Sequence, residues 1–241
     1  MVHNQATPIG RAARVMKLLL LPLLVGGLTA GVLLFTFEIE GKLPIIGVYG
    51  GILVTALIYC RQDGLDCGLR SPLYKTWFIA ALALIVGRTV IWGSILPTTY
   101  QIPKSFWRVI LYFSLVGISE EVYFHGVGYA VFSSIVDNKY KAFLLTPLPF
   151  MALHFLGNPN VLWLPLWYSN ALAYLSLLAW SRSIYPGIVA HTLIDVITSS
   201  VVMAPSDVAD ITALKYMVAV VSFNTIFVML LIRKSLKASR E

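Results

Sequence analysis

Charged residues are scarce in this sequence. Only 12% of its 241 residues are charged, whereas 58% are hydrophobic. A soluble domain of this length carries roughly twice that charged fraction. Together with a mean hydropathy of +0.80, this scarcity excludes an ordinary soluble globular protein and indicates an integral membrane protein. Polar stretches long enough to separate domains are also missing, so we expect a single membrane domain over residues 1–241.

Cysteine is scarce as well. The two cysteines, Cys60 and Cys67, are spaced C-x6-C. So few cysteines, at this spacing, provide neither a zinc-binding pattern nor a disulfide framework. We therefore expect two ordinary thiols.

The apolar runs of the chain reach about 20 residues, which suits membrane-spanning helices and exceeds the length of barrel strands. The first run follows a basic flank like that of a signal peptide, but its length and the lack of a clear A-x-A end favour a retained span. We predict an all-α, polytopic helical bundle of about eight transmembrane helices, at residues 17–37, 43–60, 76–96, 107–136, 142–157, 161–181, 184–203 and 213–232.

The net charge of +7 does not indicate a nucleic-acid partner, because the basic residues lie at the ends of the apolar runs. With the N-terminus inside, three basic residues fall on outside segments, namely Lys42, Lys104 and Arg108. Thirteen fall on inside segments: Arg11, Arg14, Lys17, Arg61, Arg70, Lys75, Lys139, Lys141, Arg182, Arg233, Lys234, Lys237 and Arg240. The positive-inside rule then predicts a multi-pass protein with both termini cytoplasmic.

A few ionisable residues remain at membrane depth, where an isolated charge costs about 2.5–3.5 kcal/mol. They include three of the four histidines. Glu121 and His125 are four residues apart and share a helix face, as do His191 and Asp195. Polar side chains projected from facing helices are how bundles build catalytic or metal sites. The complete set is Arg88, Glu120, Glu121, His125, His154, His191 and Asp195.

Structural roles are open to the same residues. A single intramembrane histidine is often an interhelical hydrogen-bonding residue, and the glutamates could pair with Arg88. One arginine cannot neutralise two adjacent glutamates without further donors, so that pairing is an incomplete account. A proton relay would also use buried carboxylates and histidines.

A carboxylate and a histidine in an apolar pocket can together deprotonate water, and a second histidine can stabilise an oxyanion. Serine and cysteine are absent from this set, so a covalent nucleophile is not indicated. The chemistry requires no cofactor. A zinc ion held by Glu120, His154 and His191 would do the same work, although the sequence lacks H-E-x-x-H.

Three motifs occur in order on three apolar helices: "EEVYFH" at 120–125, "FMALH" at 150–154 and "HTLID" at 191–195. They resemble the EExxxR, FxxxH and Hxxx(N/D) motifs of the CPBP family of intramembrane proteases, which includes CAAX prenyl endopeptidases and bacteriocin-processing proteins. The resemblance covers a catalytic core at roughly residues 105–205.

The resemblance implies glutamate-dependent peptide hydrolysis. Carried over by position, Glu120 is the general base that activates water with His154. His191 and Asp195 line the oxyanion side, and Glu121 supports the site. Two further positions complete the comparison: Phe150 fills the aromatic position, and His125 replaces the motif arginine, so Arg88 is a candidate to compensate for the lost charge. Asp195 stands where prenyl endopeptidases have asparagine.

The sequence therefore predicts an intramembrane endopeptidase that cuts a peptide or membrane-protein substrate near the surface of the lipid bilayer. A bacterial inner-membrane protein that matures a secreted peptide or trims a sorting tail is the setting we expect. Two alternatives stay open: a catalytically silent immunity or scaffold protein of the same fold, and a proton-linked transporter.

Overall fold

The computed structural model describes residues 13, 24, 43–62, 64–72, 75–100, 102–203 and 210–238. The predicted first span at 17–37 lies outside these residues, apart from Leu24. The described chain is all-α except for one two-residue ribbon, in which Thr99 pairs with Met203 and Tyr100 with Val202. The helix of the seventh predicted span therefore stops before residue 203, because Val202 and Met203 belong to this β-ribbon.

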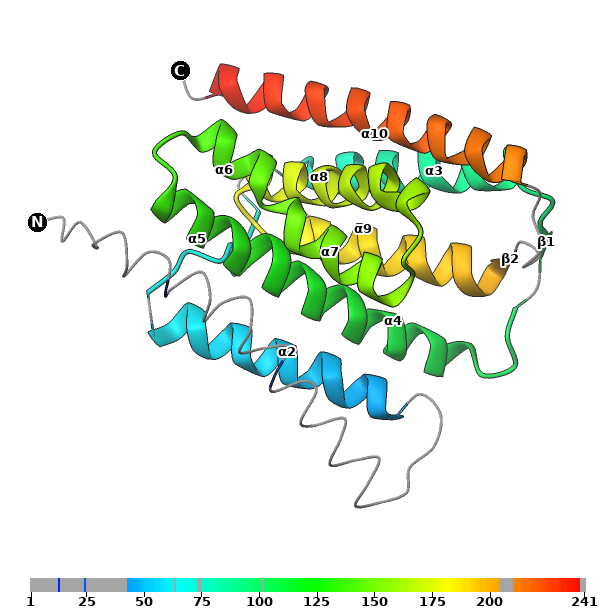
Figure 1. Ribbon diagram of the computed structural model, residues 1–241, viewed down its shortest axis with the longest axis horizontal. Coiled ribbons are helices and arrows are strands. Elements are labelled where there is room, and N and C mark those ends of the chain that lie inside the picture. Colours follow the sequence, from blue (N-terminus) through cyan, green and yellow to red (C-terminus); the bar gives the residue numbers. More distant parts are fainter. Residues whose placement is uncertain are drawn as a thin grey trace, which may run out of the picture.

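The other helices lie close to where the apolar runs predict them (Figure 1). In chain order the elements are α2 (Leu43–Gln62), α3 (Trp77–Ile95), β1 (Thr99–Tyr100), α4 (Phe106–Glu120), η1 (Glu121–Val127), α5 (Gly128–Ile135), α6 (Lys139–Leu145), α7 (Pro147–Gly157), η2 (Val161–Trp163), α8 (Leu164–Ser181), α9 (Tyr185–Val196), η3 (Ile197–Val201), β2 (Val202–Met203) and α10 (Asp210–Ala238).

The helix pattern from 106 to 135 is not regular. α4 and α5 are joined by η1, a π-helical segment that begins at Glu121. A π-helical segment places an extra residue in the turn and is often found at functional sites. The insertion turns the residues that follow it to a different face, so Glu120 and Glu121 need not share partners.

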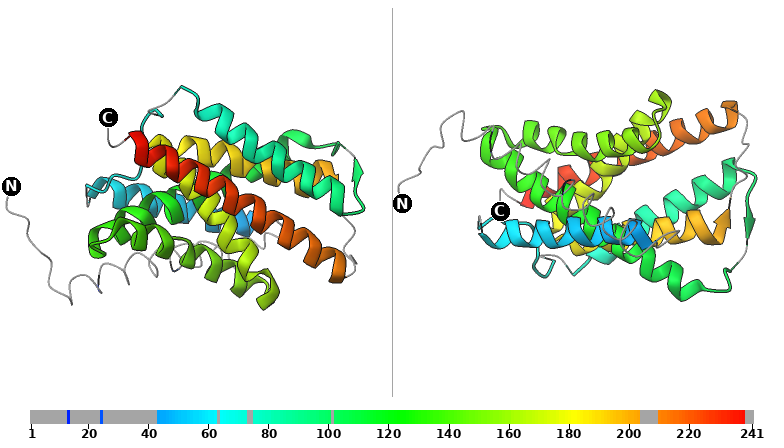
Figure 2. Two further views of the ribbon diagram at one scale, coloured as in Figure 1. Left: turned by 90° about the horizontal axis from the view of Figure 1, so that it is seen from above. Right: turned by 60° about the horizontal axis from the view of Figure 1, so that its bottom comes forward.

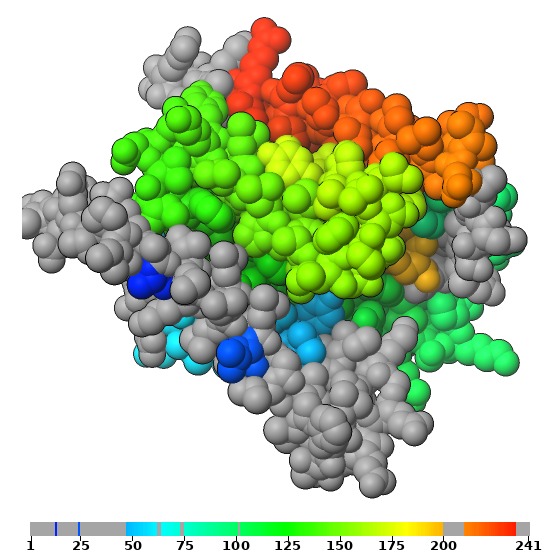
Figure 3. Space-filling model, viewed as in Figure 1, coloured from blue at the N-terminus to red at the C-terminus, as the bar shows by residue number. Residues whose placement is uncertain are grey.

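α9 lies at the centre of the bundle. It packs against α3, α4 and α8, while α2 covers α4 and η1 from the other side (Figure 2). α10 lies along α8 and α3, and α5 to α8 form much of the face seen in Figure 3. η1 and α9 therefore carry two of the three motifs into the interior.

The burial pattern of α3 is typical of a helix in a membrane protein. Phe78, Leu82, Val86 and Val90, at intervals of four residues, are exposed, whereas Arg88 is 5% exposed. An apolar face exposed in this way is stable against lipid, and a buried charge is satisfied only by protein. α3 therefore presents its apolar face to the bilayer and its arginine to the bundle.

Three described helical segments are long and apolar enough to cross a membrane: Trp77–Ile95, Val161–Ser181 and Asp210–Lys234. Gly47–Arg61 is a shorter apolar helix. The all-α multi-pass prediction is confirmed, while the number of eight spans is not established by these helices.

Several described segments that carry the predicted inside basic residues lie at one end of the bundle. Figure 1 shows the end of α2, the α5–α6 turn and the C-terminal end of α10 on that side. The Arg70 side chain donates to the carbonyl of Arg182 at 2.8 Å, which joins two of the basic connections directly. The orientation of that end in the cell stays a prediction.

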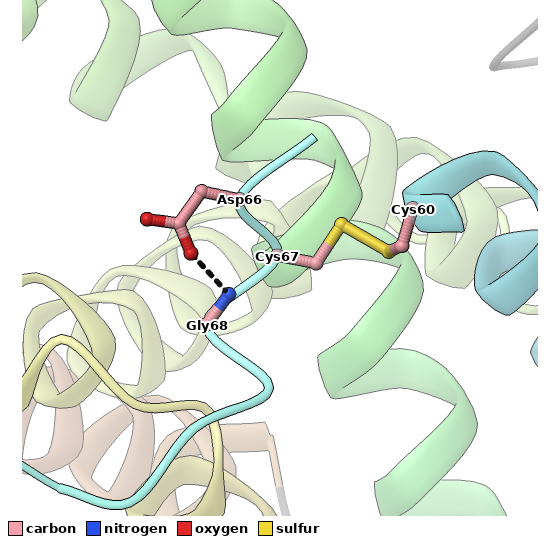
Figure 4. Close-up of a disulfide and its surroundings, with 4 residues drawn as sticks. All are labelled: Cys60, Asp66, Cys67 and Gly68. Carbon is pink, nitrogen blue, oxygen red and sulfur yellow. Dashed lines mark hydrogen bonds between the residues drawn. A yellow bond between two sulfur atoms is a disulfide. The ribbon is translucent and has the colours of Figure 1, made fainter. Parts of the chain in front are cut away.

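The expectation of two free thiols is wrong. Cys60 and Cys67 form a disulfide, with their Cα atoms 6.1 Å apart (Figure 4). α2 ends at Gln62, and the chain turns at Gly64, whose φ of +59° suits glycine. The turn brings Cys67 back beside the last turn of α2. Spacing along the sequence does not reveal such a fold-back.

Candidate active site

The two adjacent glutamates lie at the junction of α4 and η1, deep in the bundle. Glu120 is 2% exposed and Glu121 is fully buried. Buried carboxylates are stable only when they are paired or hydrogen-bonded. The structure gives the two carboxylates different partners, and this difference separates their roles.

Both oxygens of Glu121 are held by histidines. Its Oε2 lies 3.0 Å from Nδ1 of His125, one turn ahead on η1. Its Oε1 lies 2.8 Å from Nδ1 of His191 on α9. With both oxygens engaged, Glu121 can orient two imidazole rings but has little capacity left to accept a proton from water.

Glu120 is only partly satisfied. Its Oε1 accepts a hydrogen bond from the hydroxyl of Tyr49 on α2 at 2.9 Å. Its Oε2 is buried and has no hydrogen-bond partner among the described residues. Nε2 of His191 lies 3.6 Å from this oxygen, beyond a normal hydrogen bond. Glu120 therefore offers a free acceptor next to an imidazole nitrogen.

His191 joins three carboxylates. Its Nδ1 pairs with Glu121, while its Nε2 lies 3.6 Å from Glu120 and 3.5 Å from Oδ2 of Asp195. Its ring stacks on Tyr174, with centroids 4.5 Å apart and planes inclined by 11°. One nitrogen is thus fixed by Glu121, and the other is aimed between Glu120 and Asp195.

The close approach of α9 to Glu121 depends on Gly187. A Cβ atom at this position would lie 2.6 Å from Oε2 of Glu121, an oxygen already bound to His125. Real Cβ contacts are not that short, so a side chain here would push the start of α9 away. Gly187 lies one turn before His191 and lets that histidine reach the carboxylate.

His154 has no hydrogen bond or ion pair to either glutamate in the described structure. Its Nδ1 lies 3.0 Å from the carbonyl oxygen of Phe150, and its ring stacks on Phe150 with centroids 4.2 Å apart. The Phe150 ring also lies near His191, with ring centroids 6.1 Å apart. Phe150 therefore contacts both histidines.

Arg88 belongs to a separate polar network. Its guanidinium donates to Oδ1 of Asn170 on α8, and it lies 3.5 Å from the hydroxyl of Tyr216 on α10. Asn224 also donates to Asn170, at 2.9 Å. In the described part of the chain, no ion pair joins Arg88 to Glu120 or Glu121. The pairings to Glu121 are made by His125 and His191.

No group of three His, Cys, Asp or Glu side chains within the described ranges is arranged to hold a metal ion. The predicted zinc set of Glu120, His154 and His191 stays a prediction. The structure brings together Glu120, Glu121, His125, His191 and Asp195 through short side-chain distances, whereas the hydrogen bonds of His154 and Arg88 go to Phe150 and Asn170.

The sequence did not predict two residues that contact the site, Tyr49 and Tyr174. Both stand in apolar helices outside the three motifs, where a tyrosine is common and carries no pattern. Tyr49 comes from α2, more than seventy residues before the carboxylate that it binds. Only the packing of α2 against α4 reveals it.

One comparison with known proteins finds a relationship. Residues 102–197 match the family described as type II CAAX prenyl endopeptidase Rce1-like. This match agrees with the resemblance of the three motifs to the CPBP family. The matched segment contains Glu120, Glu121, His125, Phe150, His154, His191 and Asp195, whereas Tyr49 and Arg88 lie before it. No curated protein and no solved structure matches the chain. The family supports protease activity in general and a multi-pass membrane protein.

Proposed function

We propose that this protein is an intramembrane endopeptidase in which Glu120 activates water for peptide hydrolysis. One observation carries the proposal: Oε2 of Glu120 is a buried acceptor without a partner among the described residues, 3.6 Å from Nε2 of His191. A water molecule beside this oxygen would find both an acceptor for its proton and an imidazole to orient it.

In the proposed reaction Oε2 of Glu120 takes a proton from water while the water oxygen bonds to the scissile carbonyl carbon. Nε2 of His191 stabilises the oxyanion that forms, because Glu121 holds the opposite ring nitrogen and fixes the ring. Collapse of the intermediate breaks the C–N bond. Glu120 then returns the proton to the departing amine, so the products are a carboxylic acid and an amine.

The remaining residues support this reaction. Tyr49 holds the other oxygen of Glu120, so the free oxygen keeps its direction. Asp195 lies 3.5 Å from Nε2 of His191, and its side chain is 28% exposed, which suits a residue at the edge of the site. His154 is half-buried and stacks on Phe150, where it can contact a bound substrate. Divalent metal is not needed in this scheme.

For the substrate we propose a peptide bond close to the membrane surface in a lipid-anchored or membrane protein, as the family description suggests. The clustered basic residues support an orientation with both termini in the cytoplasm. A bacterial cell membrane is the proposed location.

The test uses the full chain in liposomes and internally quenched C-terminal peptides, with and without a farnesyl group. General-base catalysis typically contributes about 10²- to 10⁴-fold. Glu120→Gln keeps the size and the acceptor for Tyr49 but removes the base, so we expect a loss of at least about 100-fold in kcat.

Asp137→Asn is the matched control, because it makes the same carboxylate-to-amide change at an exposed position between α5 and α6. It should cleave like the unaltered protein. Cleavage by Glu120→Gln at the unaltered rate would overturn the assignment of the base. Absence of cleavage of every peptide by the unaltered protein would remove the proposed activity for these substrates.

A further inference from the structure

We propose that the Cys60–Cys67 disulfide is a redox-responsive clamp on the candidate active site. It would open by reduction with a cytoplasmic dithiol. The proposal rests on the packing of the disulfide loop, and it depends on the proposed function only for one of its two measurements.

The loop packs directly on the π-helical segment. Cys67 is 3% exposed, and its carbonyl oxygen faces Gly126, where a Cβ atom would lie only 2.8 Å away. Gly126 follows His125, which pairs with Glu121. A shift of Cys67 therefore acts on the segment of η1 that holds both residues.

The same loop is bound to the turn before α9. The backbone carbonyl of Gly68 accepts from the amide of Ile184 at 2.9 Å. Ser183 donates through its hydroxyl to the carbonyl of Arg70 at 2.6 Å. These bonds fix the start of α9, the helix that carries His191. The disulfide loop therefore contacts both η1 and the start of α9.

The other half of the disulfide belongs to α2. Cys60 lies in the last turn of this helix, and Tyr49 lies three turns before it. The Cys60–Cys67 bond therefore ties the helix that positions Glu120 to the loop that contacts η1 and α9 (Figure 4). Opening the bond removes the only covalent link between these supports other than the chain itself.

The disulfide is placed where a reductant can reach it. Cys60 is partly exposed, and a cavity of ≈ 320 Å³ is lined by residues on both sides of the bond: Leu57, Cys60, Arg61, Leu65, Asp66, Cys67, Leu69 and Arg70.

The basic residues favour a cytoplasmic orientation for this end of the bundle. Disulfides in that compartment are usually transient, serving catalysis or redox sensing, rather than permanent. A permanent structural disulfide would be expected on the non-cytoplasmic side of the membrane, and the basic residues disfavour that side for this end of the bundle. The presence of the disulfide and the distribution of basic residues agree if the bond forms and opens in response to the redox state of the cell.

The reaction needs a dithiol as the reductant. One thiolate of the dithiol attacks Sγ of Cys60, the sulfur–sulfur bond breaks, and Cys67 leaves as a thiolate that takes up a proton. The second thiolate of the dithiol then attacks the mixed disulfide and releases Cys60, which is also protonated. Two electrons and two protons pass to the cysteines, and the dithiol becomes a disulfide.

The experiment uses the full chain in liposomes, oxidised or treated with dithiothreitol, and measures amide hydrogen exchange in residues 121–127 and 185–196. We expect faster exchange in both segments after reduction. The double variant Cys60→Ser, Cys67→Ser should exchange like the reduced protein under either condition. Exchange in α10 serves as the internal control.

Cleavage of the quenched peptides is the second measurement. We expect reduction to lower the rate by about fivefold or more, the lower end of typical coupling between sites. Equal exchange in the oxidised and reduced protein, or a dithiothreitol effect that persists in the double variant, would overturn the clamp. Exchange that responds to reduction without any cleavage supports the clamp and removes the proposed activity for these peptides.

Discussion

Replacing Tyr49 by phenylalanine removes one hydroxyl from the candidate site. That hydroxyl donates to Oε1 of Glu120 at 2.9 Å and has no substitute in the described structure. A hydrogen bond to a charged group contributes about 1.5–3 kcal/mol. In its absence the Glu120 carboxylate can turn, and Oε2 loses its direction toward the water and His191.

A barrier increase of about 1.36 kcal/mol lowers a rate tenfold. If the lower part of the hydrogen-bond energy is lost from the transition state, Tyr49→Phe lowers kcat by about tenfold. KM should change little, because Tyr49 holds the catalytic carboxylate and not the peptide. Such a split indicates an interaction that matters in the transition state.

The assay is steady-state cleavage of the quenched peptide by the full chain in liposomes, together with thermal unfolding of each variant. Tyr140→Phe is the matched control, because Tyr140 is 54% exposed on α6 and lies outside the site. A Tyr49→Phe rate within twofold of the unaltered protein would refute the role assigned to this hydroxyl. So would a decrease in kcat that merely follows a decrease in folded protein.

Three other changes test the surroundings of the site. Gly187→Ala should lower thermal stability by about 1–3 kcal/mol and reduce cleavage, because its Cβ would collide with Glu121, whereas Gly157→Ala has open space and should do neither. His125→Asn keeps a donor near Oε2 of Glu121 and should retain activity. His125→Leu leaves that oxygen with no partner and should destabilise the fold by about 1–3 kcal/mol, measured by thermal unfolding. A metal chelator should leave cleavage unchanged; loss of the rate with recovery on adding zinc would contradict the water-activation scheme.

The boundaries of the helices followed closely from the sequence. The run predicted at 43–60 is α2 at Leu43–Gln62, and the run at 161–181 is η2 with α8. Such agreement has a local cause, because the length of an apolar run and its polar ends fix where a helix can begin and end in a membrane. The π-helical segment at Glu121 was not predicted, since its cause is a shift in hydrogen bonding that composition does not record.

The site was predicted in outline but not in its pairing. The i, i+4 spacing placed His125 beside Glu121, and the structure gives that pair a distance of 3.0 Å. The expected partnership of His154 with Glu120 stays a prediction, because the described contacts of His154 are to the carbonyl and the ring of Phe150. Arg88 bonds Asn170 instead of the glutamates, since α3 faces α8 and α10 at that level.

The sequence by itself determined that this is an all-α membrane protein with carboxylates and histidines on several helices. Hydropathy and helical spacing are local properties, so they can be read along the chain. Only the tertiary structure decided which oxygen of Glu120 stays free, that Tyr49 reaches it and that Cys60 meets Cys67. These contacts depend on how each helix is rotated and shifted against its neighbours, and close packing between helices distant in the sequence sets those positions.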